Sequence, residues 1–214
     1  YRLELAESLR VRAWPGDRSP VTMEVILWGA VAIVGYVYFG YPAVLAAWAR
    51  LAPQPVRRGE ITPALSIVIA VRNEAKRLRP RIDNLLAADY PADRMQIIVV
   101  SDGSTDGTDE ILRSYHGTLN FVLLPPGGKA LALNAGVAAA RHDVLVFADA
   151  RQTFAPDALR ALVSALADPR VGGVSGELVL DCESASTDSA IGDGVGAYWR
   201  YEKWLRRHES LVGS

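Results

Sequence analysis

The longest apolar stretch of the chain covers residues 25–49, which are 25 consecutive uncharged positions. As a helix it would extend about 38 Å at about 1.5 Å per residue, enough to cross a hydrocarbon core of about 30 Å. Pro42 predicts a kink or a split into two shorter helices. The apolar core of a secretory signal is shorter, at about 7–15 residues, and a buried core helix is the alternative. The pattern therefore predicts one transmembrane segment, over residues 23–51.

The flanks of this segment predict its orientation and its tether. Arg50, Arg57 and Arg58 follow the apolar run, whereas the preceding side mixes both signs of charge. The excess of arginine places the downstream part in the cytoplasm, at the inner or plasma membrane. Residues 1–22 form a polar tail and residues 52–63 a proline-containing linker. A domain follows over residues 64–214.

Within this domain, short apolar runs alternate with helix-forming stretches. Four of the runs are predicted strands at residues 65–70, 95–100, 120–124 and 144–148, and a fifth is expected at 171–179. The predicted helices cover 74–88, 105–115, 129–140 and 156–167. Unbroken apolar strands alternating with helices indicate βαβ units. The fold class is therefore α/β, a mostly parallel, Rossmann-like sheet with helices on both faces. A further aromatic and basic helix at 198–205 is expected to pack on protein or membrane.

Composition removes several classes of function. Apolar residues make up 50% and charged residues 22% of the chain, which excludes a disordered protein. The net charge of −1 gives no basis for a nucleic-acid partner. Cys182 is the single cysteine, so no internal disulfide can form. The three histidines are scattered and lack the spacing of metal ligands.

Polar or glycine-rich residues follow each of the first four predicted strands. Because the carboxyl ends of parallel strands meet at one edge of a sheet, these residues should converge on one site. The segments are Val71-Arg72-Asn73-Glu74, the loop Ser101–Thr108, the stretch Pro125–Lys129 and Asp149-Ala150-Arg151. The first turn lacks G-x-G-x-x-G, which disfavours a nicotinamide-dinucleotide fold.

Three of these residues suggest ligand contacts, each with a simpler alternative. Asp102 lies at a strand tip, where it could accept a hydrogen bond from a base or ribose; its loop neighbours are explained by a turn and by helix capping. Lys129 follows two glycines at a helix start, which suits a diphosphate, although it could be a solvated first-turn residue. Asp149 suits Mg²⁺ or Mn²⁺, and an ion pair with Arg151 or Arg141 is the alternative.

The order of these segments resembles family 2 glycosyltransferases, which have the GT-A fold. The resemblance rests on the following stretches: LSIVIAVRNE at 65–74, IIVVSDGSTDGT at 97–108, KALALNAG at 129–136, VLVFADAR at 144–151 and VGGVSGE at 171–177. The resemblance implies an inverting transfer of a sugar from a nucleoside diphosphate, with UDP as the expected nucleotide, to a saccharide or lipid acceptor. A divalent metal, Mg²⁺ or Mn²⁺, would sit on the diphosphate.

The resemblance also implies roles for particular residues. Val71, Glu74 and Asp102 would contact the nucleotide, Lys129 would lie near the phosphates, and Asp149 would bind the metal as the first acid of a D-x-D motif. Arg151 stands where the second acid would be, so it could contact phosphate directly. The family's general base is an Asp expected beyond Ser214, so we expect the chain to be truncated and to turn over little sugar alone.

Two competing functions stay open. The replacement of the second acid by Arg151 would also fit a catalytically impaired, nucleotide-sugar-binding membrane module. A nucleotidyltransferase acting on sugar phosphates shares the α/β architecture, but it would need a glycine-rich and basic loop directly after the first strand. The segment from Val71 to Glu74 is neither.

Overall fold

The computed structural model describes residues 20–177 and 190–213, so Cys182 and most of the predicted N-terminal tail lie outside the described residues. The chain divides into two compact units, each described below by itself: Tyr1–Pro55 with Thr187–Ser214, and Val56–Ser186. The predicted segment boundaries at residues 22, 51 and 63 stay predictions.

The first unit contains the apolar helix. It consists of α1 (Pro20–Gly35), a π-helical turn η1 (Tyr36–Gly40) and α2 (Tyr41–Leu51). Thr22–Leu51 is long and apolar enough to cross a membrane, with a mean hydropathy of 1.7. The predicted disturbance at Pro42 takes the form of the π turn directly before it. Proline has no N–H to donate to the carbonyl of Tyr38, and the hydroxyl of Tyr201 donates to that carbonyl at 3.3 Å instead.

Tyr201 belongs to α7 (Ala190–Val212), the aromatic and basic helix predicted from the sequence. Within the first unit, α7 packs along α2. The hydroxyl of Tyr41 donates to Oε1 of Glu209 over 2.8 Å. The backbone N–H of Gln54 donates to the carbonyl of Leu211 over 2.6 Å. These contacts attach the second half of α7 to the apolar helix and to the residues directly after it.

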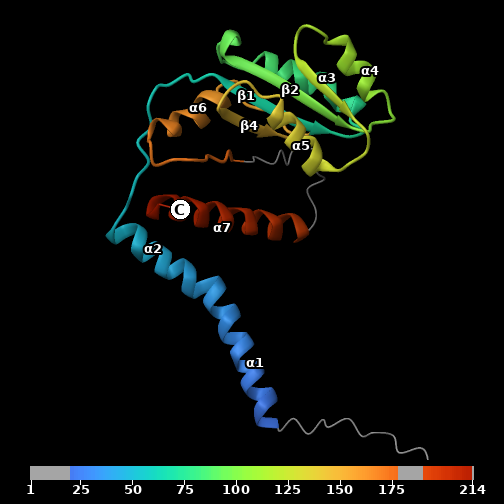
Figure 1. Ribbon diagram of the computed structural model, residues 1–214. Helices are drawn as coiled ribbons and strands as arrows, with labels where there is room; N and C mark the ends of the chain where they lie inside the picture. The colour runs from blue at the N-terminus through green and yellow to red at the C-terminus, as the bar shows by residue number, and fades with distance from the viewer. Residues whose placement is uncertain (1–19, 178–189, 214) are drawn as a thin grey trace, which may run out of the picture. The chain divides into compact units, whose positions relative to one another are not determined.

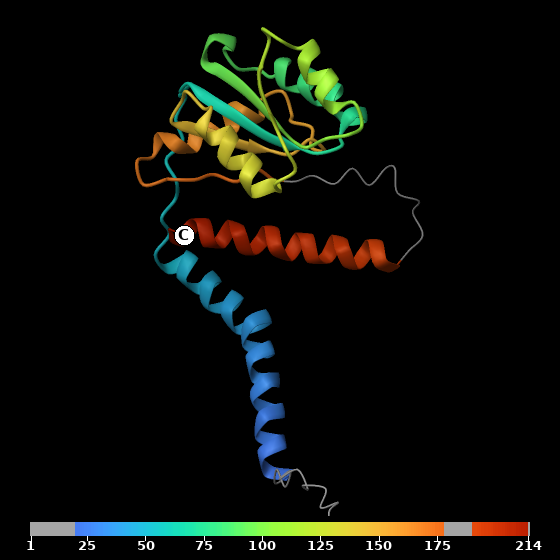
Figure 2. The same ribbon diagram turned by 45° about the vertical axis from the view of Figure 1, so that its right-hand side comes forward.

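The second unit is built on a four-stranded parallel sheet (Figures 1 and 2). Its strands are β1 (Leu65–Val71), β2 (Met95–Asp102), β3 (Asn120–Leu124) and β4 (Val144–Ala148), in the order β3-β2-β1-β4. Leu65 pairs with Met95 on one side and with Val144 on the other. All four strands lie where the apolar runs predicted them, which confirms the α/β class with a parallel sheet.

The predicted fifth strand is wrong in its described part. Residues 171–177 form no strand, and 178–179 lie outside the described residues. The stretch is rich in glycine, with Gly172, Gly173 and Gly176, and glycine loses the most conformational freedom on entering a strand. Among the described strands β4 is therefore at the sheet edge, and the side chain of Phe147 is 57% exposed.

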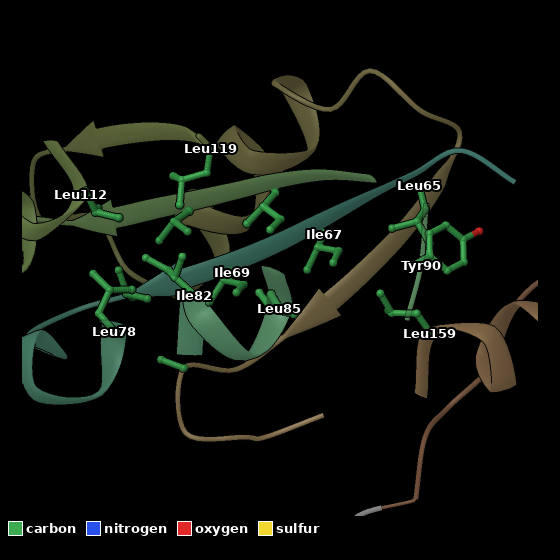
Figure 3. Packing of buried hydrophobic residues seen from close by; sticks show 14 of the residues in the cluster. Leu65, Ile67, Ile69, Leu78, Ile82, Leu85, Tyr90, Leu112, Leu119 and Leu159 are labelled. Carbon is green, nitrogen blue, oxygen red and sulfur yellow. The ribbon is translucent and has the colours of Figure 1, made fainter. Parts of the chain in front are cut away.

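Helices cover both faces of the sheet. Alternate strand residues point to opposite sides, so each face presents apolar side chains for a helix to cover. Ile67 and Ile69 of β1 pack with α3 (Ala75–Leu86), α4 (Thr108–Ser114) and α6 (Ala158–Ser164); Figure 3 shows this cluster. Val68 points the other way and packs with α5 (Lys129–Ala138). A Cβ on Gly136 of α5 would stand 2.3 Å from Cγ1 of Val68, so glycine permits this close approach.

In the first unit, α7 extends beyond the predicted 198–205 at both ends. In the second unit, α3, α4 and α6 lie inside their predicted limits, and α5 begins at the predicted Lys129 but ends at Ala138. Two short 3-10 turns, Ala92–Arg94 and Ala165–Ala167, complete the unit. The largest shift of a helix start in this unit is at α4, which begins at Thr108 and not at 105. Oδ1 of Asp106 accepts the backbone N–H of Thr108, the first residue of the helix, at 3.1 Å. Asp106 therefore lies before the helix and binds a backbone N–H at its start.

Candidate functional site

The carboxyl ends of β1, β2 and β4 and the start of α5 surround one open pocket. All six residues singled out from the sequence line it: Val71, Glu74, Asp102, Lys129, Asp149 and Arg151. They come from four separate segments of the chain, and the parallel sheet brings those segments to one edge. The structure thus places the predicted site residues together, while their roles toward a ligand stay predictions.

Asp149 follows β4 and is the more accessible of the two strand-end aspartates in the pocket. Its side chain is 45% exposed, and Nζ of Lys129 lies 3.7 Å from Oδ2. The other oxygen, Oδ1, accepts the backbone N–H of Arg151 at 3.1 Å. The alternative for Asp149, an ion pair with the side chain of Arg151 or Arg141, is not formed, and the carboxylate pairs with Lys129. Asp149 therefore keeps a solvent-facing carboxylate.

Arg151 pairs instead with Glu74. Its Nε lies 2.8 Å from Oε1 of Glu74, whose side chain is only 8% exposed. Arg77 contacts the other oxygen at 3.1 Å. These arginines, Arg151 first, hold the pKa of Glu74 below its usual value. Glu74 thus ties the end of β4 to the end of β1, and the side chain of Arg151, 70% exposed, remains accessible beside the pocket.

Asp102 has a structural partner that sequence reasoning missed. Its Oδ1 accepts the backbone N–H groups of Gly127 and Gly128 at 2.7 and 2.9 Å. Oδ2 accepts the Gly128 N–H at 3.0 Å and lies 3.7 Å from Nη1 of Arg72. The side chain is 6% exposed. Asp102 therefore holds the loop between β3 and α5, which places Lys129 at the rim of the pocket.

The loop after β2 packs tightly against that β3–α5 loop. Gly103 has a φ of +63°, and a Cβ there would stand 2.4 Å from Cγ of Pro126. Only glycine fits both the conformation and the space. The predicted turn at Gly103 is thus confirmed, and its physical reason includes a neighbour distant in sequence.

Asn73 is a site-building residue that the sequence reasoning did not select. It adopts a left-handed φ of 54°, which asparagine tolerates better than most residues. Its backbone N–H donates to Oγ of Ser104 at 3.1 Å, and its Oδ1 accepts the N–H of Thr105 at 2.8 Å. Oδ2 of Asp106 accepts the N–H of Ala75 at 3.0 Å. These bonds join the β1–α3 and β2–α4 loops, and the Asn in a strand-end turn was the available signal.

The carboxylates of the pocket decide whether it fits a divalent cation. No group of three or more His, Cys, Asp or Glu side chains that could hold a metal occurs among residues 20–177 and 190–213. Mg²⁺, however, is commonly held by one or two carboxylates together with substrate phosphates and water. One exposed carboxylate, Asp149, beside the cations Lys129 and Arg151 fits a metal that arrives with a diphosphate.

Comparison with known proteins defines the class. The family glycosyl transferase family 2 matches residues 66–200, so the chain belongs to this family. A solved structure similar to this chain is the mannosyltransferase PcManGT from Pyrobaculum calidifontis in complex with GDP-Man and Mn²⁺. It has a TM-score of 0.55 and 32% identity, over 67% of this chain and 45% of that one. The GT-A fold and the resemblance seen in the sequence are confirmed.

Curated relatives agree with this assignment. The chain is 34% identical to a probable glycosyltransferase, YdaM, of Bacillus subtilis, over 54% of this chain and 29% of the relative. It is 29% identical to the beta-monoglucosyldiacylglycerol synthase of Synechocystis, over 90% of this chain and 42% of that synthase. It is also 29% identical to a poly-beta-1,6-N-acetyl-D-glucosamine synthase of Staphylococcus aureus, over 67% of this chain and 35% of that synthase. The chain therefore spans less than half the length of the curated relatives it matches.

Proposed function

We propose that this chain carries the donor-binding site of a membrane-bound, inverting glycosyltransferase that uses a nucleoside-diphosphate sugar. The observation that carries the proposal is the convergence of Asp149, Lys129 and Arg151 on one pocket. A carboxylate beside two cations suits a pyrophosphate bridged to a divalent metal. The presence of GDP-Man and Mn²⁺ in the mannosyltransferase structure supports this choice of ligand.

In this proposal the reaction is a single displacement. The acceptor hydroxyl attacks the anomeric carbon opposite the diphosphate and gives its proton to a general base, an Asp carboxylate by the family resemblance. The bond from that carbon to the diphosphate oxygen breaks, and its electron pair leaves with the diphosphate. Lys129 and Arg151 stabilise the charge that develops on the phosphate oxygens. Asp149 would hold Mg²⁺ or Mn²⁺, which supplies further charge neutralisation at the same oxygens.

The remaining pocket residues are proposed to bind the nucleotide. Val71 ends β1 at the wall of the pocket, where it would contact the nucleotide. Asp102 already accepts backbone N–H groups of Gly127 and Gly128. It would bind the base or ribose in addition to these hydrogen bonds. Glu74 would act through Arg151, because its carboxylate is already shared between two arginines.

The donor and acceptor are proposed at the level of chemical class. We expect a UDP-sugar, with GDP-mannose as the competitor that the mannosyltransferase structure suggests. The synthases from Staphylococcus aureus and Synechocystis are named for a polysaccharide and a glycolipid product. They support a saccharide or a lipid as the acceptor.

The membrane location is also part of the proposal. Thr22–Leu51 would span the inner or plasma membrane, with Arg50, Arg57 and Arg58 placing the sheet unit in the cytoplasm. Thiol labelling of a Ser114→Cys variant in a Cys182→Ser background, in intact and in opened cells, tests this. We expect the introduced thiol to be labelled only in opened cells, and labelling in intact cells would contradict the orientation.

Calorimetric titration of the detergent-solubilised chain tests the proposed site. UDP-sugars and GDP-mannose are titrated with Mn²⁺ and with a chelator. We expect binding of one donor to be at least about 10-fold tighter with Mn²⁺, because Asp149 would hold the metal and the metal would neutralise charge on the diphosphate. Absence of binding for every nucleotide sugar tried would overturn the proposal.

The second candidate is a nucleotide-sugar-binding module without transfer. The observation in its favour is that Arg151 occupies the position of a second metal-binding acid and is held by Glu74. Metal-independent binding of a nucleotide sugar, unaffected by Asp149→Asn, would favour this module over the enzyme.

A further inference from the structure

A buried arginine lies beneath the segment that carries Asp149 and Arg151. Arg81 in α3 is 2% exposed and shares the buried face of that helix with Leu78, Ile82 and Leu85. A fully buried charge is costly unless it is paired, yet no carboxylate among the described residues forms a salt bridge with Arg81. An aliphatic side chain would fill this apolar position at a lower cost, so the guanidinium needs another explanation.

The contacts of Arg81 lead to the loop after β4. Its Nη1 donates to Oδ1 of Asn84 at 2.7 Å, and its guanidinium carbon lies 4.2 Å from the centre of the Phe154 ring. Asn84 in turn holds the backbone of Phe154 on both sides. Oδ1 of Asn84 accepts the N–H of Phe154 at 2.8 Å, and Nδ2 donates to the carbonyl of Phe154 at 2.9 Å.

Phe154 is five residues beyond Asp149 and three beyond Arg151 in the connection from β4 to α6. One end of this connection is fixed by β4 and by the pair of Arg151 with Glu74. The cluster of Arg81, Asn84 and Phe154 fixes the other end. Burial lowers the pKa of Arg81, while the negative charge of Asp149 acts on it in the opposite direction.

Two donor groups of Arg81 strengthen this argument. Its Nε and Nη2 are buried and have no hydrogen-bond partner among residues 20–177 and 190–213. Leaving buried donor groups unpaired destabilises the folded state. Packing alone does not explain a buried arginine with unpaired donor groups. Its hydrogen bond to Asn84 and its cation–π contact with Phe154 do explain it.

We propose that Arg81 is a positioning residue for the donor-phosphate site, fixing the connection between Asp149 and Phe154 through Asn84 and the Phe154 ring. The proposal rests on the proposed function for its ligand, a metal-bound nucleoside diphosphate. It predicts that loss of Arg81 loosens the connection and weakens the metal-dependent part of binding. Metal-independent binding of the nucleotide should change little.

The test compares Arg81→Met and Arg81→Lys in the whole chain, with Arg79→Met as the matched control. Arg79 lies on the same helix and also stands over an aromatic ring, that of Tyr115, at 5.8 Å. Its other partner, Ser114, lies in α4, away from the connection after β4 in the sequence. Binding of UDP and GDP is measured with and without Mn²⁺, and amide hydrogen exchange is measured over residues 149–156 without ligand.

Arg81→Met is expected to weaken Mn²⁺-dependent diphosphate binding about 10- to 100-fold, as is typical for residues that orient metal ligands. Without metal, the affinity should change less than about 2-fold, and exchange over 149–156 should accelerate. Arg81→Lys should recover part of both losses because it keeps the charge over the ring. Arg79→Met should leave both readouts unchanged.

Unchanged exchange over 149–156 in Arg81→Met would overturn the proposal, as would an equal loss of binding with and without metal. If Arg81→Met does not fold, Phe154→Leu removes the ring partner and keeps an apolar side chain; the same two readouts then decide. Failure of the wild-type chain to bind any nucleoside diphosphate would refute the proposed function. The exchange result would still decide whether Arg81 orders the connection.

Discussion

Asp102 and Asp149 each close a parallel strand and line the same pocket, yet their surroundings differ. Asp102 is 6% exposed and accepts backbone N–H groups from two successive glycines. Asp149 is 45% exposed, accepts one backbone N–H and has an ammonium at 3.7 Å. Two similar sequence positions therefore do different work. Asp102 fixes the β3–α5 loop that lines the site, and the carboxylate of Asp149 remains accessible to a ligand.

The largest expected effect is on binding at Asp149. Asp149→Asn removes the charge that would hold the metal, so Mn²⁺-dependent affinity for a nucleoside diphosphate should fall at least about 100-fold. Its stability should stay within about 0.5 kcal/mol of the wild type because the side chain is well exposed. Calorimetry and thermal unfolding measure the two effects.

Asp143→Asn is the matched control for Asp149→Asn, since Asp143 directly precedes β4 at the opposite end of the strand and is exposed. It should change neither affinity nor stability. If Asp149→Asn bound as tightly as the wild type in Mn²⁺, the comparison between the two aspartates would be wrong.

The next effect is on stability at Asp102. Asp102→Ala leaves the N–H groups of Gly127 and Gly128 without their acceptor, at a cost of about 2–4 kcal/mol. Thermal unfolding of the solubilised chain should then shift down by roughly 4–15 °C. A melting temperature equal to that of the wild type would mean that the glycine loop does not depend on this carboxylate.

A smaller effect is expected at Lys129. Lys129→Gln removes the ammonium beside Asp149, so affinity for the diphosphate should fall about 3- to 10-fold. The loss should shrink at high salt because the side chain is 68% exposed and its charge is screened. Lys129→Arg, which keeps the charge, is the control. An affinity loss independent of salt would argue against a direct charge contact.

The smallest effect is a pH dependence at Glu74. Arg151 and then Arg77 hold its pKa below the usual 4.5. A depressed folded-state pKa adds stability above the unfolded-state value, and that stability is lost as pH falls through the folded-state value. The advantage of the wild type over Glu74→Gln in melting temperature should thus persist at pH 7 and decline as the pH falls below the usual 4.5 toward the lower folded-state value. An advantage that is constant across this range would contradict the ion pair.

Much of the fold was predictable from the sequence because it depends on local pattern. The predicted strands at β3 and β4 match the observed ones from end to end. Asp143 and Asp149 bound β4, and Pro125 follows β3. The strand prediction failed over residues 171–177, where three glycines interrupt the apolar positions and disfavour an extended strand. The gathering of the site residues followed from parallel topology alone.

The pairings within the site were not predictable, since they depend on contacts between distant segments. Glu74 and Arg151 are 77 residues apart, and Asp102 and Gly127 are 25 apart. Arg81 carried a usable signal. It lies three residues after Leu78 and four before Leu85, on the apolar face of a predicted helix, where a charged residue is unusual.

The most direct test is a crystal structure of the chain with Mn²⁺ and a nucleoside diphosphate, with the metal located by its anomalous scattering. The account predicts the metal within coordination distance of the Asp149 carboxylate, bridging to the diphosphate, with Asp102 still bonded to Gly127 and Gly128. A metal coordinated by Asp102, or a diphosphate bound away from Asp149 and Lys129, would contradict it.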